Sequence, residues 1–233
     1  MSTTMTDDNP TTPSAQPGLH SESQKRGIRY TLIGIVLVVV FFMSMFTHKI
    51  LSPRILSNAE LLNNRAVVFD QPRIIKPINL LDHQGDSFTL KNFEDKWTLI
   101  YFGFTHCPDI CPTTLAKMNQ VVGKLDQKFA DQVQVAMVTV DPARDTQEKL
   151  AAYVPFFNPE FIGVGGEFLD ILKFTQNLNV AFNKVVTGDT YTIDHTGNLA
   201  LINPRGHYHG FFKPPFELAA MKVTLQSIIA SDQ

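Results

Sequence analysis

The sequence contains little cysteine, little tryptophan and no excess of charge of either sign. Its only cysteines are Cys107 and Cys111, and charged residues make up 18% of the 233 positions. A disulfide between such close cysteines would stabilise the fold by only about 2 kcal/mol in the chain-entropy model, so disulfides do not hold this chain together. The cysteine pair is therefore better explained by chemistry than by structural support.

The formal net charge of -2 argues against one broad function. Proteins that bind nucleic acid present a strongly basic face to the phosphates, and this balance of charge offers none. Apolar residues make up 44% of the chain, which is typical of a protein with a packed core. We therefore expect a globular protein with no nucleic-acid partner.

Charge is missing altogether from one segment near the N-terminus. The 19 residues between Arg29 and Lys49 include no Asp, Glu, Lys or Arg. As a helix they would span about 28 Å, close to the roughly 30 Å hydrocarbon core of a bilayer. A cleaved signal peptide has an apolar region of about 7–15 residues that ends at a small-x-small site, which is not found here. We predict a transmembrane anchor over residues 29–48, with a cleaved signal or a buried helix as alternatives.

The segment before the predicted anchor, residues 1–28, is rich in Thr, Ser and Pro and poor in bulky apolar residues, which is typical of disorder. Flanking basic residues favour a cytoplasmic N-terminus by a small margin, with Lys25, Arg26 and Arg29 before the span and Lys49 and Arg54 after it. We therefore expect a single-pass protein of the bacterial inner membrane, with a disordered cytoplasmic tail and a C-terminal domain in the periplasm.

The rest of the chain is predicted to form a tether over residues 49–65 and an α/β domain over residues 66–233. Short apolar runs at 98–104 and 133–140 indicate buried strands, and helical spacing follows each of them. Strand–helix–strand units that end in a hairpin and a helix predict a layered α/β fold. The further expected elements are helices at 112–129, 146–156, 166–178 and 217–229, and strands at 191–193, 198–202 and 207–212.

The two cysteines follow the first predicted strand, and Pro112 suits the first turn of the next helix. A helix N-terminus stabilises a thiolate and lowers the pKa of a thiol. A spacing of four places both side chains on the same side of a helical turn. Such a pair can bind a soft metal or form a disulfide, and spacing alone does not choose between them.

The residues around the pair resemble the signature of the Sco/SenC family of copper proteins, which assist assembly of the copper site of cytochrome c oxidase. The match covers G-F-T-H-C-P-D-I-C-P-T-T-L at residues 103–115. Two further blocks, T-V-D-P-A-R-D-T at 139–146 and Y-T-I-D-H-T at 191–196, occur in the order that the family has. The resemblance implies a thioredoxin-like fold for residues 66–233, a single N-terminal anchor and exposure outside the cytoplasm.

The resemblance also implies a ligand set for copper, as Cu(I), Cu(II) or both. Cys107 and Cys111 match the family's thiolate ligands, and His195 matches its imidazole ligand. Thiolates suit Cu(I), and an added imidazole makes a site that can also hold Cu(II), whereas structural zinc usually takes four protein ligands. Asp141 matches a family aspartate near the site, although Asp-Pro also suits a turn. Asp194 either orients His195 or is a solvated loop residue.

These observations favour a membrane-anchored metallochaperone that passes copper to the copper-receiving subunit of cytochrome c oxidase. Other copper carriers or thiol reductants are expected as further partners. The alternative is a thiol–disulfide oxidoreductase that keeps oxidase cysteines reduced, in which Cys107 attacks and Cys111 resolves; a peroxide-reducing enzyme is a third class. The three residues between the cysteines, against two in thioredoxins, and His195 in place of a thioredoxin proline favour metal over disulfide exchange.

Overall fold

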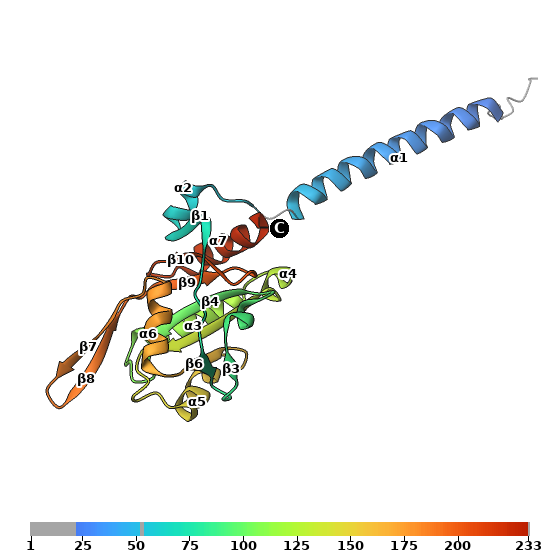
Figure 1. The fold of residues 1–233 in the computed structure, drawn as a ribbon. Coiled ribbons are helices and arrows are strands. Elements are labelled where there is room, and N and C mark those ends of the chain that lie inside the picture. The colour runs from blue at the N-terminus through green and yellow to red at the C-terminus, as the bar shows by residue number, and fades with distance from the viewer. Residues whose placement is uncertain (1–21, 52–53, 233) are drawn as a thin grey trace, which may run out of the picture. The chain divides into compact units, whose positions relative to one another are not determined.

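The computed structural model describes residues 22–51 and 54–232 of the chain. Contacts divide the chain into two compact units, Met1–Ser52 and Pro53–Gln233. Figure 1 shows a long helix in the first unit and a mixed α/β body in the second.

The first unit contains one helix, α1 (Glu22–Leu51). Its segment Arg26–Thr47 has the length and composition needed to cross a membrane, and every side chain from 26 to 47 is exposed. The helix predicted over residues 29–48 is therefore present. The disorder predicted for residues 1–28 is wrong for its last part, because the helix already begins at Glu22; residues 1–21 lie outside the described part of the chain.

An eight-stranded sheet forms the centre of the second unit, in the order β1-β10-β9-β4-β5-β6-β2-β3. The central strands β4, β5 and β6 are parallel to one another, and the flanking pairs are antiparallel. The strand bounds are β1 (Ala66–Ile74), β2 (Leu80–Asp82), β3 (Ser87–Phe88), β4 (Trp97–Gly103), β5 (Val133–Thr139), β6 (Ile162–Gly165), β9 (Leu199–Ile202) and β10 (His207–Phe212).

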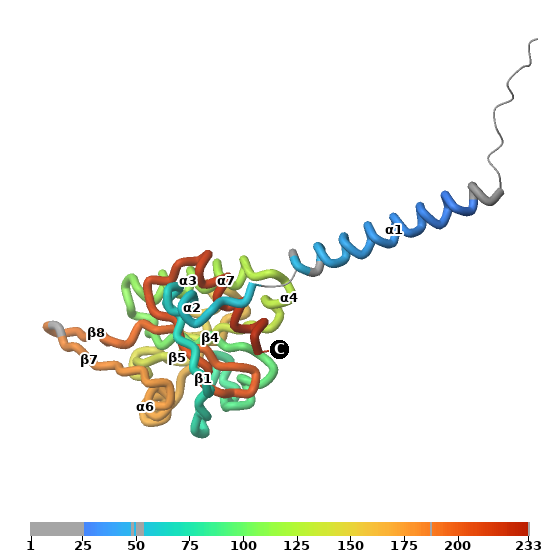
Figure 2. Tube along the Cα trace, turned by 90° about the horizontal axis from the view of Figure 1, so that it is seen from above, coloured from blue at the N-terminus to red at the C-terminus, as the bar shows by residue number. Residues whose placement is uncertain are grey.

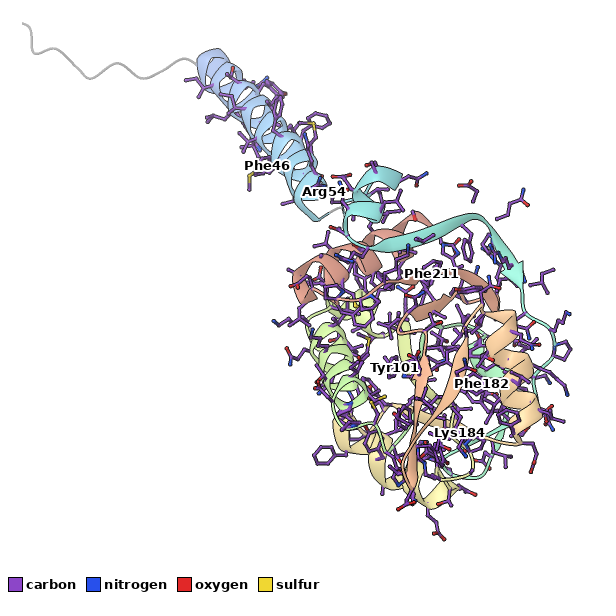
Figure 3. The ribbon with its side chains drawn as sticks, turned by 90° about the vertical axis from the view of Figure 1, so that its left-hand side faces the viewer. Phe46, Arg54, Tyr101, Phe182, Lys184 and Phe211 are labelled. Carbon is purple, nitrogen blue, oxygen red and sulfur yellow. The ribbon has the colours of Figure 1, made fainter. Side chains whose placement is uncertain are left out.

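Helices cover both faces of this sheet. Figure 3 shows α3, in pale green, and α6, in tan, on opposite sides of the strands, and α3 also packs against α7 and α5. Every residue of β4 is buried, which explains why this strand is a continuous apolar run rather than an alternating one. The helices are α2 (Asn58–Asn63), a 3₁₀ turn η1 (Leu90–Phe93), α3 (Ile110–Val122), α4 (Gln127–Ala130), α5 (Gln147–Phe157), α6 (Phe168–Asn177) and α7 (Leu218–Ser231).

A hairpin of β7 (Phe182–Thr187) and β8 (Thr190–His195) forms a separate two-stranded sheet. Figures 1 and 2 show both strands running out from the body of the second unit. Their register leaves a two-residue loop in which Gly188 has a φ of 60°, a conformation that glycine adopts without strain. The hairpin matters for the site because His195 is the last residue of β8.

The segment predicted as a tether, residues 49–65, differs from the expectation. Ser57 and Glu60 form a capping box that starts α2, and Leu61 of that helix is buried. Leu56 is also buried, and its N–H donates to Ser227 Oγ at 2.7 Å. The folded domain therefore includes residues before 66, because Leu56 and Leu61 belong to its core cluster.

Candidate metal centre

The cysteines lie where the two central parallel strands end. Gly103 ends β4 beside Thr139 at the end of β5, and α3 begins at Ile110. We call residues 104–109, between β4 and α3, the cysteine loop. Loops at the carboxyl ends of parallel strands are the usual place for binding sites in α/β folds. The topology therefore puts Cys107 and Cys111 at a position suited to a ligand.

A glycine at the end of β4 gives Cys111 its room. A Cβ atom on Gly103 would lie 2.7 Å from the ring of Tyr101 and 3.2 Å from Cys111 Sγ. Both neighbours are buried and have little freedom to move. Only glycine therefore allows the sulfur of Cys111 to pack directly over the end of this strand.

The two cysteines are free thiols with unequal surroundings. Cys107 is partly exposed, and its Sγ accepts a hydrogen bond from the Cys111 N–H at 3.3 Å. Cys111 is 0% exposed, and the hydroxyl of Tyr101 donates to its Sγ at 3.4 Å. The pair therefore has one sulfur at the surface and one in the core.

Burial raises the pKa of the Cys111 thiol to about 12. The expectation that the helix N-terminus lowers the thiol pKa is wrong for this cysteine, because loss of solvent outweighs the helix dipole. Cys111 is therefore a thiol at neutral pH in the metal-free protein. A bound metal reverses this preference, since coordination deprotonates a thiol outright.

His195 reaches the cysteines from a distant part of the chain. Its Nε2 lies 4.0 Å from Cys111 Sγ, across 84 positions of sequence. Its ring also makes edge contacts with Tyr101 and Phe104, at centroid distances of 5.9 and 6.1 Å. The structure thus brings together the three residues that the sequence motif proposes as ligands.

The imidazole of His195 is in the neutral form that a metal ligand needs. Burial lowers its pKa, against the opposing effects of the Thr196 carbonyl and the Asp194 charge, so the ring is neutral near pH 7. Nδ1 lies 3.2 Å from the Thr196 carbonyl oxygen, which can only accept a hydrogen bond. The proton is therefore on Nδ1, and the unprotonated Nε2 faces the sulfur of Cys111 with its lone pair.

The spacing of these donors fits a shared metal after a small contraction. Sulfur and nitrogen ligands at bond lengths of about 2.3 and 2.0 Å lie roughly 3.5–3.7 Å apart at tetrahedral or trigonal angles. The observed 4.0 Å between Cys111 Sγ and His195 Nε2 is a few tenths of an ångström wider. Accordingly, no group of three His, Cys, Asp or Glu side chains in the described ranges already has metal-binding geometry.

A cleft of about 650 Å³ opens beside Cys107 and His195. Acidic and basic side chains such as Asp109 and Lys117 contribute to its lining, but most of its walls are apolar. These apolar walls come from Phe104, Ile110, Ile193, Pro214, Pro215 and Phe216. The surface sulfur and the imidazole are thus accessible to another molecule.

Asp141 is linked to the candidate metal site through Tyr191. The residue is buried, and its carboxylate forms an ion pair with Arg144 and accepts a hydrogen bond from the Tyr191 hydroxyl at 2.9 Å. Because Tyr191 belongs to β8, this contact joins Asp141 to the strand that carries His195. The aspartate therefore supports the hairpin and makes no direct contact with a sulfur in the described structure.

Asp194 does not orient His195 by a hydrogen bond. Its side chain is exposed, and within the described residues it forms no hydrogen bond or ion pair. The orienting partner of the imidazole is the Thr196 carbonyl. The physical reason is strand alternation: Asp194 and His195 are neighbours in β8 and point to opposite faces.

Sequence reasoning missed the anchor of the cysteine loop, Asp145. This buried carboxylate accepts hydrogen bonds from Thr105 N–H at 2.9 Å, Thr105 Oγ1 at 2.5 Å and Thr139 Oγ1 at 2.6 Å. The helix predicted over 146–156 is α5, which begins at Gln147 with Thr146 as its N-cap, so Asp145 lies just outside it. The signal was the acidic residue in a loop after a buried strand, at the same sheet end as the cysteines.

The fold and the site together define a thioredoxin-like α/β protein with a cysteine pair and a histidine at one end of its central sheet. Residues 69–230 match the SCO1/SenC family, and the chain belongs to that family. The family resemblance of the sequence motifs is thereby confirmed.

Similar proteins include two solved structures with copper bound. ScoI of Arabidopsis thaliana has a TM-score of 0.64 and 31% identity, covering 68% of this chain and 99% of that chain. ScoI of Bradyrhizobium japonicum has a TM-score of 0.57 and 35% identity, covering 68% and 98%. A protein of Stutzerimonas stutzeri is 32% identical over 177 residues, 76% of this chain and 87% of the relative. The chain spans about half the length of the mitochondrial relatives that it matches.

Proposed function

We propose that this protein binds one copper ion through Cys107, Cys111 and His195, and that it assists assembly of the copper site of cytochrome c oxidase. One observation carries the proposal: His195 Nε2 lies 4.0 Å from Cys111 Sγ across 84 positions. The copper-bound relatives support copper as the metal. Two thiolates and an imidazole also form a donor set suited to Cu(I) and able to hold Cu(II).

The unequal exposure of the sulfurs suits a carrier. Cys111 is buried and Cys107 is partly exposed beside the cleft. A donor atom of an acceptor protein can approach from the cleft and replace Cys107 first, while Cys111 still holds the ion. Copper then passes by ligand exchange to the copper-receiving oxidase subunit without release to solvent.

We propose that α1 anchors the protein in a bacterial inner membrane as a single pass, with Pro53–Gln233 in the periplasm. The support is the segment Arg26–Thr47, which is long and apolar enough to cross a membrane, and the basic residues Lys25, Arg26 and Arg29 at its N-terminal end. Labelling of the native cysteines in intact spheroplasts tests this topology, because an impermeant thiol reagent reaches Cys107 only if the domain is outside. Labelling that requires lysis contradicts it.

The metal proposal is tested by copper analysis of the full-length protein in detergent. We expect one copper per chain, with a sulfur-to-Cu(II) charge-transfer band and nitrogen hyperfine coupling. Loss of a residue that only hydrogen-bonds to a metal ligand weakens metal binding by about 10–100-fold. His195→Ala removes a proposed ligand and should weaken copper binding by more than this. His207→Ala is the control, because His207 lies on β10 outside the cleft lining. Unchanged affinity in His195→Ala contradicts the ligand set.

A thiol–disulfide oxidoreductase is the second candidate, favoured by the partly exposed Cys107 at the start of α3. Its thiolate would attack a partner disulfide and form a mixed disulfide. Cys111 would then attack Cys107 Sγ, so that the pair is oxidised and both partner thiols are released reduced. The raised pKa of Cys111, about 12, works against the second step. Rapid reduction of protein disulfides by His195→Ala would favour this function.

A further inference from the structure

The hairpin that carries His195 has no partner strand outside itself. Among the described strands, β7 and β8 pair only with each other. The cysteines, by contrast, are on the body of the second unit, at the start of α3. The base of the hairpin is fixed by the backbone, since Thr196 N–H donates to the Ala181 carbonyl oxygen at 2.9 Å, whereas the direction of the strands beyond it depends on side-chain contacts with the body.

Arg144 provides the most extensive of these contacts. It lies in the loop after β5, and its Nη1 donates to the Tyr191 carbonyl oxygen of β8 at 2.9 Å. Its guanidinium also lies 3.7 Å from the centroid of the Tyr191 ring. One side chain of the body thus holds both the backbone and the ring of a hairpin residue.

Asp141 fixes the guanidinium in place. It forms an ion pair with Arg144 Nε, and its other carboxylate oxygen accepts the Tyr191 hydroxyl at 2.9 Å. The Arg144 side chain is 21% exposed and that of Asp141 is 4% exposed. Because both charges are largely removed from water, the geometry of the pair is far more restricted than at an open surface.

The same arginine also contacts the surroundings of the imidazole. Its guanidinium lies 5.9 Å from the centroid of the Phe104 ring, and the His195 ring lies 6.1 Å from that centroid. Phe104 belongs to the cysteine loop and is 2% exposed. Arg144 and His195 therefore pack against one buried ring beside the cysteines.

Strand geometry carries the restraint from Tyr191 to His195. Alternate residues of a strand face the same side, so Tyr191, Ile193 and His195 share one face of β8. At about 3.3 Å per residue, the contacts at Tyr191 act on the same face of the strand roughly 13 Å from the imidazole. Ile193, between them, is buried, so this face of β8 packs against the body along its length.

We propose that Arg144 is a positioning residue for the metal centre, which holds β8 so that His195 Nε2 faces Cys111 Sγ. The inference rests on the proposed function, because the positioned group is the proposed imidazole ligand. Arg144 itself contacts neither sulfur in the described structure. Its effect on copper therefore passes through the hairpin.

The test compares Arg144→Gln with Lys184→Gln in the full-length protein in detergent. Lys184 Nζ lies 3.7 Å from the same Tyr191 ring, but Lys184 is on β7 and so does not join the hairpin to the body; Figure 3 labels this residue on the hairpin. Both variants lose one positive charge beside one ring. We expect Arg144→Gln to weaken Cu(II) binding by about 10–100-fold and Lys184→Gln to change it less than twofold.

Two further variants separate positioning from folding. Arg144→Lys keeps a cation for Asp141 but lacks the planar fork that reaches the Tyr191 carbonyl. We expect it to unfold at the wild-type temperature and still to bind Cu(II) several-fold more weakly. The double variant Arg144→Gln, His195→Ala should bind Cu(II) as tightly as His195→Ala alone. Once the imidazole is absent, loss of the residue that positions it has no further effect on copper affinity.

A metal-free measurement keeps this proposal distinct from the proposed function. In the wild-type protein without metal, nuclear Overhauser contacts between the His195 and Phe104 rings should be present. They should be lost in Arg144→Gln and kept in Lys184→Gln. If the contacts persist in Arg144→Gln, or if its copper affinity is that of the wild type, Arg144 does not position His195. If the wild type binds no copper but these contacts change as expected, the copper function fails and the positioning stands.

Discussion

At the scale of single residues, the surroundings of the site depend on buried or partly buried polar groups whose partners lie on other elements. Tyr101 donates to the Cys111 sulfur, Asp145 holds the cysteine loop, and Arg144 holds β8. Each of these groups loses water on folding and forms the hydrogen bonds named here only in the completed structure. Their replacement is therefore costly even where the new side chain has the same shape.

Asp145→Asn tests how much the buried hydrogen bonds of the cysteine loop contribute to stability. The amide can present NH₂ where Thr105 or Thr139 already donates, which leaves buried donors facing one another. We expect the free energy of unfolding to fall by about 1–3 kcal/mol, measured by denaturant titration. Asp170→Asn is the control, because its ion pair with Lys173 is at the surface and should be worth about 0–1 kcal/mol. A wild-type midpoint for Asp145→Asn would refute the anchoring role.

His209 makes stability depend on pH. It is 8% exposed, its ring packs edge-on to Trp97 at 4.9 Å, and Nδ1 is buried without a hydrogen-bond partner among the described residues. Burial lowers its pKa, whereas in the unfolded chain a histidine titrates at about 6.5. The unfolded state therefore binds the proton first as pH falls, and the folded state loses stability below about pH 6.5.

The measurement compares wild type with His209→Phe, which keeps the aromatic contact and removes the titration. In metal-free protein between pH 7 and 5, the wild type should lose stability more steeply, by at most about 1.4 kcal/mol per pH unit. Carboxylates contribute equally to both proteins. Parallel stability curves would show that His209 does not bind this proton.

At the scale of elements, the chain could be predicted best where a segment is buried on both faces. The apolar runs at 98–104 and 133–140 became β4 and β5 within one residue at each end. The helix predicted over 112–129 is divided into α3 and α4, because the chain turns after Val122 and a second short helix begins at Gln127. Strand β1 was not predicted, since it is an edge strand with mixed burial and contains Pro72.

The end of β4 has no room for a side chain at position 103. Gly103→Ala would place a Cβ 2.7 Å from the Tyr101 ring and 3.2 Å from Cys111 Sγ. We expect a loss of about 1–3 kcal/mol from overpacking. Gly197→Ala is a matched control, because its nearest neighbour would be Pro214 Cγ at 3.6 Å, an ordinary contact. Equal thermal midpoints for the two variants would contradict the steric argument.

At the scale of the whole molecule, the candidate ligand residues could be found in the sequence, whereas the residues that support them could not. Cys107, Cys111 and His195 stand in short motifs that can be recognised without a structure, although their role as copper ligands remains a prediction. Arg144 looks like a solvated loop residue in the sequence, because its partner Tyr191 lies 47 positions away. Only the topology, with the hairpin beside the ends of β4 and β5, reveals such a contact.

The division into two compact units predicts that residues 53–233 fold without the helix. That unit contains its own sheet, both helical layers and the candidate site. Deletion of residues 1–52 should give a monodisperse protein that needs no detergent, with the same thermal midpoint and copper affinity as the full chain. Aggregation, or a midpoint lowered by several degrees, would show that α1 contributes to the domain.

The separation of 84 positions between Cys111 and His195 also has a consequence during synthesis of the protein. A nascent chain holds its thiols long before the imidazole has been synthesised, so the complete donor set exists only when the domain is nearly finished. Closing a loop of that length costs about 4 kcal/mol of chain entropy plus a constant. Under the proposed function, a copper ion bound by both Cys111 and His195 would crosslink positions 84 residues apart, and we expect it to slow unfolding of the completed protein.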